Sequence, residues 1–270
     1  MTDPPIPALD LVQRTLAVEI AYTISRMQVA ERIPGNPIGM AYRWVGDGAV
    51  AMMSRLPAFA RVMGLRSGHE RHIEPLVHWY REHGVTPTFE MVPALWDASL
   101  GRELARRGFY QSGFHTSLIC RPPPPAAAFD GETVIEAVTT VEAMEHYLDA
   151  YVAGWGIPEG DRPQFRVNVR PWLEQPGWSL YLARIDGKPA AAATLYVQDR
   201  TAYLADAATD PSFRRRGLQT ALLRRRMRNA GTAGADLLCS GADPFSTSHR
   251  NMERAGMRLQ FVRAMWTPVP

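Results

Sequence analysis

The residues best suited to chemistry lie in one segment, 209–223, which reads TDPSFRRRGLQTALL. A β-prone run ends there, a proline turn and three arginines follow, and then an apolar helical period begins. The first amides of a helix lack intrahelical partners and lie at the positive end of its dipole, so they bind diphosphates. Gly217 lets the backbone approach closely, and Arg214 or Arg216 can add charged hydrogen bonds. The segment indicates a phosphate-binding turn; the alternative is a solvated basic helix start.

Alternating strands and helices position this turn in the second half of the chain. The patterns predict strands at 133–140, 179–185, 190–198, 201–208, 235–240 and 259–267, and helices at 141–155, 162–173, 218–230 and 246–255. Asp186-Gly187 predicts a tight hairpin between the second and third strands. This order predicts one mixed sheet with helices, an α/β (α+β) fold.

The first half has a similar but less regular order. The patterns predict strands at 42–55, 60–64, 88–92 and 110–120, and helices at 69–83 and 99–107. In each half a helix stops at a glycine, Gly108 or Gly256, and the strand that follows runs into a proline. The shared ending predicts that the two halves are copies of one fold.

Four consecutive prolines, Pro122–Pro125, followed by three alanines, separate the halves. Such a run cannot lie inside a helix or a central strand, and it favours an extended connector. We therefore predict two domains, 1–125 and 126–270, each near a common domain size.

Composition narrows the class of protein. With 46% hydrophobic and 21% charged residues the chain reads as soluble and globular. It has no membrane-length apolar run and no secretory signal, so we expect a cytoplasmic protein without a membrane partner. Cys120 and Cys239 form no disulfide framework, and His69 and His72 lack a third ligand, so we expect no metal.

Positive charge is not gathered on one part of the chain. The net charge is only +3, and basic and acidic residues are balanced in both halves. Only 214–228 is locally rich, and we expect the arginines of 224–228 to form the solvated face of their helix. Nucleic acid is therefore not an expected partner.

With these elements in place, the chain resembles the GNAT superfamily of N-acetyltransferases. The family signature, Arg/Gln-x-x-Gly-x-Gly/Ala after the fourth strand, corresponds here to Arg214-x-x-Gly217-x-Gln219. Residues 251–257, NMERAGM, resemble the family's motif before its last strands. The resemblance covers roughly 130–267, and it implies two GNAT-like domains in tandem with a degenerate first domain.

The resemblance implies direct transfer of an acetyl or other short acyl group from acetyl-CoA to an amine of a small molecule. Backbone groups of 207–209 would pair with the pantetheine arm, the amides of 215–220 would hold the pyrophosphate, and Asn251 would contact the cofactor from the next helix. The predicted cofactor-binding residues are Ala207, Ala208, Thr209, Arg214, Arg215, Arg216, Gly217, Leu218, Gln219, Thr220 and Asn251.

Some residues depart from the family pattern. Gln219 replaces the usual small residue, so its side chain must turn away from the phosphates or contact them. Met252 stands where many members carry a tyrosine that protonates the departing thiolate, and Met257 replaces a common phenylalanine. Cofactor binding is therefore better supported than proton transfer, and a non-catalytic acyl-CoA-binding or regulatory module is the alternative function.

Tyr203 and Asp206 are the candidate catalytic residues, because both lie on the strand before the turn. Tyr203 falls near the position where some family members place a catalytic acidic residue. Asp206 could instead bind a cationic substrate or stay a surface carboxylate. His249 is a further candidate proton donor, otherwise exposed, and Cys239 is expected in the core. We expect a monomer or homodimer.

Overall fold

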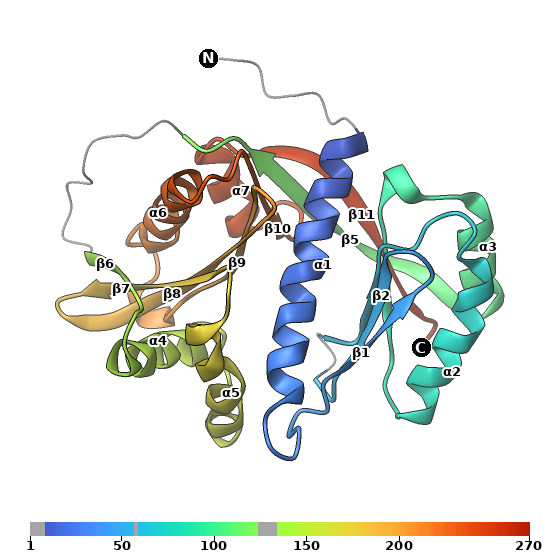
Figure 1. The fold of residues 1–270 in the computed structure, drawn as a ribbon, viewed down its shortest axis with the longest axis horizontal. Helices are drawn as coiled ribbons and strands as arrows, with labels where there is room; N and C mark the ends of the chain where they lie inside the picture. The colour runs from blue at the N-terminus through green and yellow to red at the C-terminus, as the bar shows by residue number, and fades with distance from the viewer. Residues whose placement is uncertain (1–8, 57–58, 124–133) are drawn as a thin grey trace. The chain divides into compact units, whose positions relative to one another are not determined.

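The computed structural model describes residues 9–56, 59–123 and 134–270 (Figure 1). These residues form two compact units. The C-terminal unit contains the described residues of Leu118–Gly241 and Phe245–Leu259; the N-terminal unit contains those of Pro7–Ser117, Ala242–Pro244 and Gln260–Pro270. The predicted linker lies, from Pro124 onward, outside the described residues, and the domain boundary stays a prediction.

The C-terminal unit is built on a mixed sheet with strand order β10-β9-β8-β7-β6. Its strands are β6 (Val134–Ala137), β7 (Trp178–Ile185), β8 (Lys188–Gln198), β9 (Thr201–Thr209) and β10 (Leu237–Ala242). Its helices are α4 (Val141–Gly154), α5 (Arg162–Val169), α6 (Leu218–Thr232) and α7 (Thr247–Arg254). Each element lies within a few residues of its predicted position, and the predicted α/β class is confirmed.

Local chemistry explains several of these boundaries. Asp186 and Gly187 both have positive φ, 50° and 73°, as a tight hairpin between β7 and β8 requires. Thr140 caps α4 by accepting from the Ala143 amide, and Ser246 caps α7 by accepting from the His249 amide.

Strand β9 contains a bulge. Its pairing with β8 changes register between Ala192↔Ala208 and Thr194↔Ala205, so Asp206 and Ala207 together face one residue of β8. Asp206 adopts a left-handed φ of 46° at this point. On the other edge of β9, the parallel pairs described with β10 run from Leu237↔Thr201 to Cys239↔Tyr203 and stop before the bulge. The last residues of β9 therefore lie beyond this described ladder.

The N-terminal unit has strand order β1-β2-β3-β4-β11-β5. Its strands are β1 (Ala41–Val45), β2 (Ala49–Met53), β3 (Arg61–Met63), β4 (Thr88–Met91), β5 (Phe109–Cys120) and β11 (Arg258–Pro268), and its main helices are α1 (Leu9–Glu31), α2 (Ile73–Glu82) and α3 (Ala98–Arg106). The single strand predicted at 42–55 is wrong: Gly46, Asp47 and Gly48 turn the chain, and the two glycines have positive φ, so it forms a hairpin. The predicted helix at 69–83 is also divided, into a 3₁₀ turn (Glu70–His72) and α2.

The two units share one connectivity. In each, three antiparallel strands lead into a helix and then into a strand parallel to the third: β1-β2-β3, α2, β4 in one unit and β7-β8-β9, α6, β10 in the other. The loop that joins β3 to α2 is therefore the counterpart of the loop that joins β9 to α6.

Helix α1, the long blue helix of Figure 1, has no counterpart among the predicted elements. Its buried face interrupts the apolar period, because Thr15, Glu19 and Thr23 lie buried at successive four-residue steps. Val12, Leu16 and Ile20 still pack it onto the sheet. No described helix carries a stretch apolar and long enough to span a bilayer.

A buried ion network ties three elements of the N-terminal unit together. Arg263 of β11 donates to Glu19 of α1 through both terminal nitrogens, at 3.0 and 2.6 Å, and to Glu90 of β4 at 2.6 Å. Arg61 adds a second cation beside Glu90 at 3.1 Å. Burial alone would raise the pKa of Glu90, but the charges of Arg61 and Arg263 hold it well below its ordinary value.

We expect Arg263→Met to lower the free energy of unfolding by about 3–5 kcal/mol, because it leaves two buried carboxylates without their shared cation. The contribution of ionised Glu90 to the free energy of unfolding should be complete above the ordinary pKa of 4.5. It should decline as pH falls below that value, since the pKa of Glu90 is lower in the folded protein. Urea denaturation at several pH values measures both effects. Arg258→Met, an exposed arginine on the same strand, is the control; equal stabilities of the two variants would contradict the prediction.

Candidate functional site

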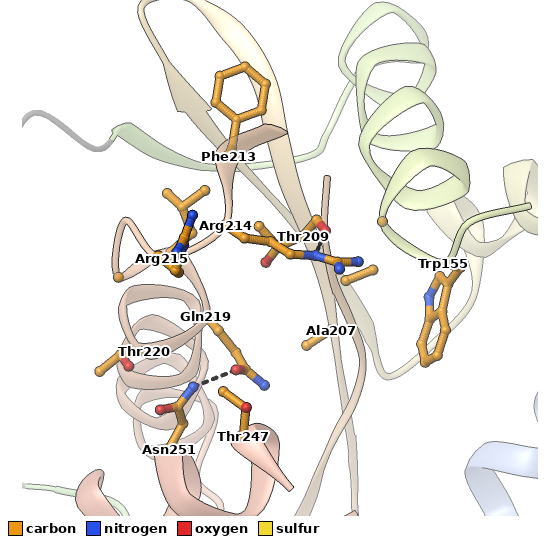
Figure 2. Close-up of a pocket in the computed structure, with 14 residues that line it drawn as sticks. Trp155, Ala207, Thr209, Phe213, Arg214, Arg215, Gln219, Thr220, Thr247 and Asn251 are labelled. Atoms are coloured by element: carbon orange, nitrogen blue, oxygen red, sulfur yellow. Dashed lines mark hydrogen bonds between the residues drawn. The ribbon is translucent and has the colours of Figure 1, made fainter. Parts of the chain in front are cut away.

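A cavity of about 570 Å³ lies where β9 ends and α6 begins (Figure 2). It is lined by Gly154, Trp155, Ala207, Ala208, Thr209, Phe213, Arg214, Arg215, Gly217, Leu218, Gln219, Thr220, Thr247 and Asn251. All the residues predicted to bind a cofactor are in this lining except Arg216. The fold thus gathers them at one cavity of the C-terminal unit, and their binding role stays a prediction.

The turn before α6 presents backbone amides that precede the helical hydrogen-bond ladder. Asp210 accepts from the Ser212 amide at 2.8 Å, which shapes the turn after β9. Gly217 caps α6 with a left-handed φ of 77°, a conformation that suits glycine. The first helical bond runs from the Ala221 amide to the Gly217 carbonyl at 3.0 Å, so the amides of 218–220 precede the intrahelical ladder. Such an edge is suited to an anion.

The arginines of the turn divide into two groups. Arg214 is exposed, and its Nε lies 3.4 Å from the Thr209 carbonyl; in Figure 2 its side chain extends toward the end of β9. Arg215 also lines the cavity. The guanidinium of Arg216 instead lies 5.8 Å from the Phe213 ring centre. Two cations therefore face the cavity, and the third lies against an aromatic ring.

Gln219 turns toward α7. Its Nε2 donates to Ser248 Oγ at 2.9 Å, and its Oε1 accepts from Asn251 Nδ2 at 2.5 Å. Asn251 Oδ1 in turn accepts from Arg254 at 3.0 Å. Figure 2 shows Gln219 and Asn251 joined below the arginine turn. The carboxamide of Gln219 therefore links α6 to α7, while the residue also lines the cavity.

The strand side of the cavity is formed by residues 207–209, beyond the bulge. Just before the bulge, Ser240 Oγ donates to the Leu204 carbonyl at 2.7 Å, and Cys239 Sγ lies 3.4 Å from the Ala202 carbonyl. Cys239 is buried, as expected of a core residue. An extended ligand arm placed beside 207–209 could form hydrogen bonds with the backbone of these residues, as an added β-strand does.

The candidate catalytic residues are not in the cavity lining. Tyr203 is half-buried in β9, opposite Tyr196, and Asp206 is half-buried at the bulge. His249 is buried rather than exposed, and its Nδ1 accepts from the Phe245 amide at 3.0 Å. Among the described lining residues, arginines are the only ionisable groups. The described lining therefore offers positive charge, and it contains no carboxylate, histidine or tyrosine.

Gly154 and Trp155 belong to the site but were not predicted. A Cβ at Gly154 would lie 2.7 Å from the Ala208 Cβ and 2.8 Å from the Thr209 amide nitrogen, so the end of α4 touches β9 directly. The adjoining Trp155 is 51% exposed although it lines the cavity, and Figure 2 shows its indole across the open space from Gln219. The close approach of α4 to β9 depends on tertiary packing. The only local sign of it in the sequence is a glycine near the end of a predicted helix.

The charged groups of the counterpart turn in the N-terminal unit are paired with one another. Asp47 of the β1–β2 hairpin binds His69 at 2.8 Å and forms an ion pair with Arg66, while Ser99 donates to Glu70 at the helix start. The hydrogen bonds from His69 and then Arg66 lower the pKa of Asp47 to about 2, so this carboxylate is ionised at neutral pH. The arginine of this turn is thus already bound to a carboxylate, whose charge would also repel a diphosphate.

His69 lies beside His72 at the start of the helical segment. The rings of His69 and His72 meet edge to face, with centroids 5.7 Å apart. Within 9–56, 59–123 and 134–270, no cluster of three or more potential ligands from histidine, cysteine, aspartate and glutamate is present.

Residues 126–245 match the protein family described as "Acetyltransferase (GNAT) domain". This match places residues 126–245 in the GNAT superfamily and supports acyl transfer in general. The fold of the chain is that of GNAT proteins, tandem ones included, and a degenerate first domain stays a prediction. No curated protein matches the sequence.

Solved structures of similar fold span nearly the whole chain. A GCN5-related N-acetyltransferase from Kribbella flavida has a TM-score of 0.65 at 17% identity, covering 94% of this chain and 96% of that one. A tandem GNAT protein from the clavulanic acid biosynthesis pathway has a TM-score of 0.61 at 14% identity, covering 98% and 97%. A GCN5-related N-acetyltransferase from Sphaerobacter thermophilus has a TM-score of 0.57 at 17% identity, covering 98% and 93%. At these identities the similarity establishes the fold alone.

We expect Gly154→Ala to lower the free energy of unfolding by about 1–3 kcal/mol, because the new methyl must push the end of α4 away from β9. Gly160→Ala is the matched control, since its Cβ would meet nothing within 4 Å. Chemical denaturation compares the two. A loss no greater than that of the control would show that the two elements separate freely.

Proposed function

We propose that the C-terminal unit binds acetyl-CoA in the cavity at the β9–α6 turn and transfers its acetyl group, or another short acyl group, to an amine of a small molecule. One observation carries the proposal: the amide edge before α6 and the end of β9 line the same cavity. The first suits a diphosphate and the second suits an extended amide-containing arm, and CoA contains both.

In this proposal the amides from Arg215 to Thr220 hold the pyrophosphate. Arg214 and Arg215 add positive charge beside it, since both are exposed and line the cavity. The pantetheine arm runs along 207–209, and Trp155 covers it from the side opposite Gln219. Asn251 donates a hydrogen bond to Gln219 and thereby holds α7 beside α6.

The chemistry is a direct transfer. The neutral amine nitrogen attacks the thioester carbonyl carbon, a C–N bond forms, and the C–S bond breaks; the nitrogen loses a proton and the thiolate gains one. A thiol pKa of roughly 8.5 allows the thiolate to leave without a dedicated acid, so Met252 is compatible with turnover. The main contribution of the site is to hold amine and thioester together. Tyr203 and Asp206 stay candidates for removing the amine proton, directly or through one water.

The alternative is a non-catalytic acyl-CoA-binding or regulatory module. It is favoured by Met252, which is buried and cannot donate a proton, and by the absence of acids and bases among the described lining residues.

A cytoplasmic setting and a monomer or homodimer also stay predictions.

Gly217→Glu should weaken acetyl-CoA binding about 100-fold, because a carboxylate would then stand at the proposed pyrophosphate site. Gly217→Ala is the control for backbone strain at φ 77° and should lose much less. Calorimetry measures both. We expect one CoA per native chain, because Arg66 and His69 of the counterpart turn are already paired with Asp47. Unchanged affinity of a folded Gly217→Glu protein would remove the central claim.

Turnover separates the enzyme from the binding module. Incubation of the protein with acetyl-CoA and a panel of small amines should release free thiol only when an acceptable amine is present, with an equal amount of acetylated product. Thiol titration and mass spectrometry measure the two products. Tight acetyl-CoA binding without release on any amine would favour the module, and Gly217→Glu serves as the inactive control.

A further inference from the structure

Arg226 is a buried cation inside the C-terminal unit. The arginine run from Arg224 to Arg226 was expected on the solvated face of α6, and for Arg226 this expectation is wrong: its side chain is 2% exposed, whereas Arg224 is exposed. A buried guanidinium is costly unless its donors are satisfied. Its position therefore calls for a physical reason.

The partners of Arg226 lie at the bulge of β9. Its Nη1 donates to the carbonyls of Thr194 and Ala205, at 2.9 Å each, and its Nε donates to the Leu222 carbonyl at 3.3 Å. Thr194 and Ala205 are the register pair next to the bulge, at which the regular ladder of β8 and β9 is interrupted before it resumes at Ala192↔Ala208. A bulge disrupts the ladder and leaves carbonyls to be satisfied by other donors. Arg226 supplies those donors from the helix.

The surroundings keep this cation charged. Burial lowers the pKa of Arg226 to about 10, and the groups of Tyr147, Tyr181 and Asp206 oppose the shift. The guanidinium therefore stays protonated at neutral pH and donates along several fixed directions, which a lysine ammonium cannot reproduce. Tyr147 also binds the Thr194 hydroxyl at 2.9 Å, so the same β8 residue is fixed through its side chain and its backbone.

We propose that Arg226 is a positioning residue of the acyl-CoA site: it holds the β9 bulge so that residues 207–209 present their backbone to the pantetheine arm. The identity of the ligand rests on the proposed function. Asp206 adopts a left-handed backbone conformation that is uncommon outside glycine, and such a conformation persists only where neighbouring groups hold it. Arg226 contacts the residue just before it and the paired residue of β8, while residues 207–209 line the cavity just after it.

The test compares Arg226→Met and Arg226→Lys with Arg224→Met, an exposed arginine on the same helix. Hydrogen exchange of the ligand-free proteins reports on the bulge. We expect faster exchange in 203–209 for both Arg226 variants, with unchanged exchange in 218–223 and in the control. If the methionine variant does not fold, the lysine variant, which keeps a positive charge, carries the comparison. Unchanged exchange in 203–209 of a folded Arg226 variant would overturn the proposal.

Affinity measurements with two ligands separate a specific effect on β9 from a general loss of stability. Two ligands are used: acetyl-CoA, and 3′-phosphoadenosine 5′-diphosphate, which lacks the pantetheine arm. Arg226→Met should weaken acetyl-CoA about tenfold and leave the arm-less ligand within about twofold. An equal loss for both ligands would contradict a specific role at β9. If the native protein binds neither ligand, the proposed function fails, and the exchange comparison still decides whether Arg226 holds the bulge.

Discussion

The bulge in β9 is the constraint on which the site depends. Because Asp206 and Ala207 together face one residue of β8, the strand is irregular just beyond its described parallel ladder with β10. Residues 207–209 line the cavity, while Ala208 and Thr209 stay paired with β8. Gly154 is required where it stands because this part of β9 passes within contact distance of the end of α4. The turn into α6 follows directly, so one local irregularity places both the strand wall and the amide edge.

The two units show how one connectivity acquires two charge patterns. Each has a strand, a loop, a helix and a parallel strand in the same order. In the C-terminal unit the loop carries exposed arginines around a left-handed glycine. In the N-terminal unit Asp47 reaches the corresponding loop from the β1–β2 hairpin and binds His69 and Arg66. The loop of the N-terminal unit is thereby bound to a neighbouring carboxylate, so the same connectivity supports either exposed or internally paired charges at this position.

The sequence predicts the parts of this molecule that depend on local pattern. The turn before α6, the hairpin at Asp186-Gly187 and nearly every element of the C-terminal unit follow from spacing, capping residues and turn residues. Helix α1 does not, because Glu19 on its buried face is neutralised by Arg263, 244 positions away in the sequence. The sequence pattern puts Arg226 on the wrong side of its helix for a related reason. Its burial depends on carbonyls at a bulge that no local pattern predicts.

The position of Arg226 also bears on how a site with so little acid–base equipment could work. The described lining offers amides, hydroxyls and guanidinium groups, and Met252 supplies no proton. If direct transfer takes place, most of its acceleration must come from orientation, whose effect declines steeply with small displacements. A site of this kind depends strongly on a rigid frame. A guanidinium buried beneath the bulge, bound to both strands that form it, gives the required rigidity at the point where the thioester arm would lie.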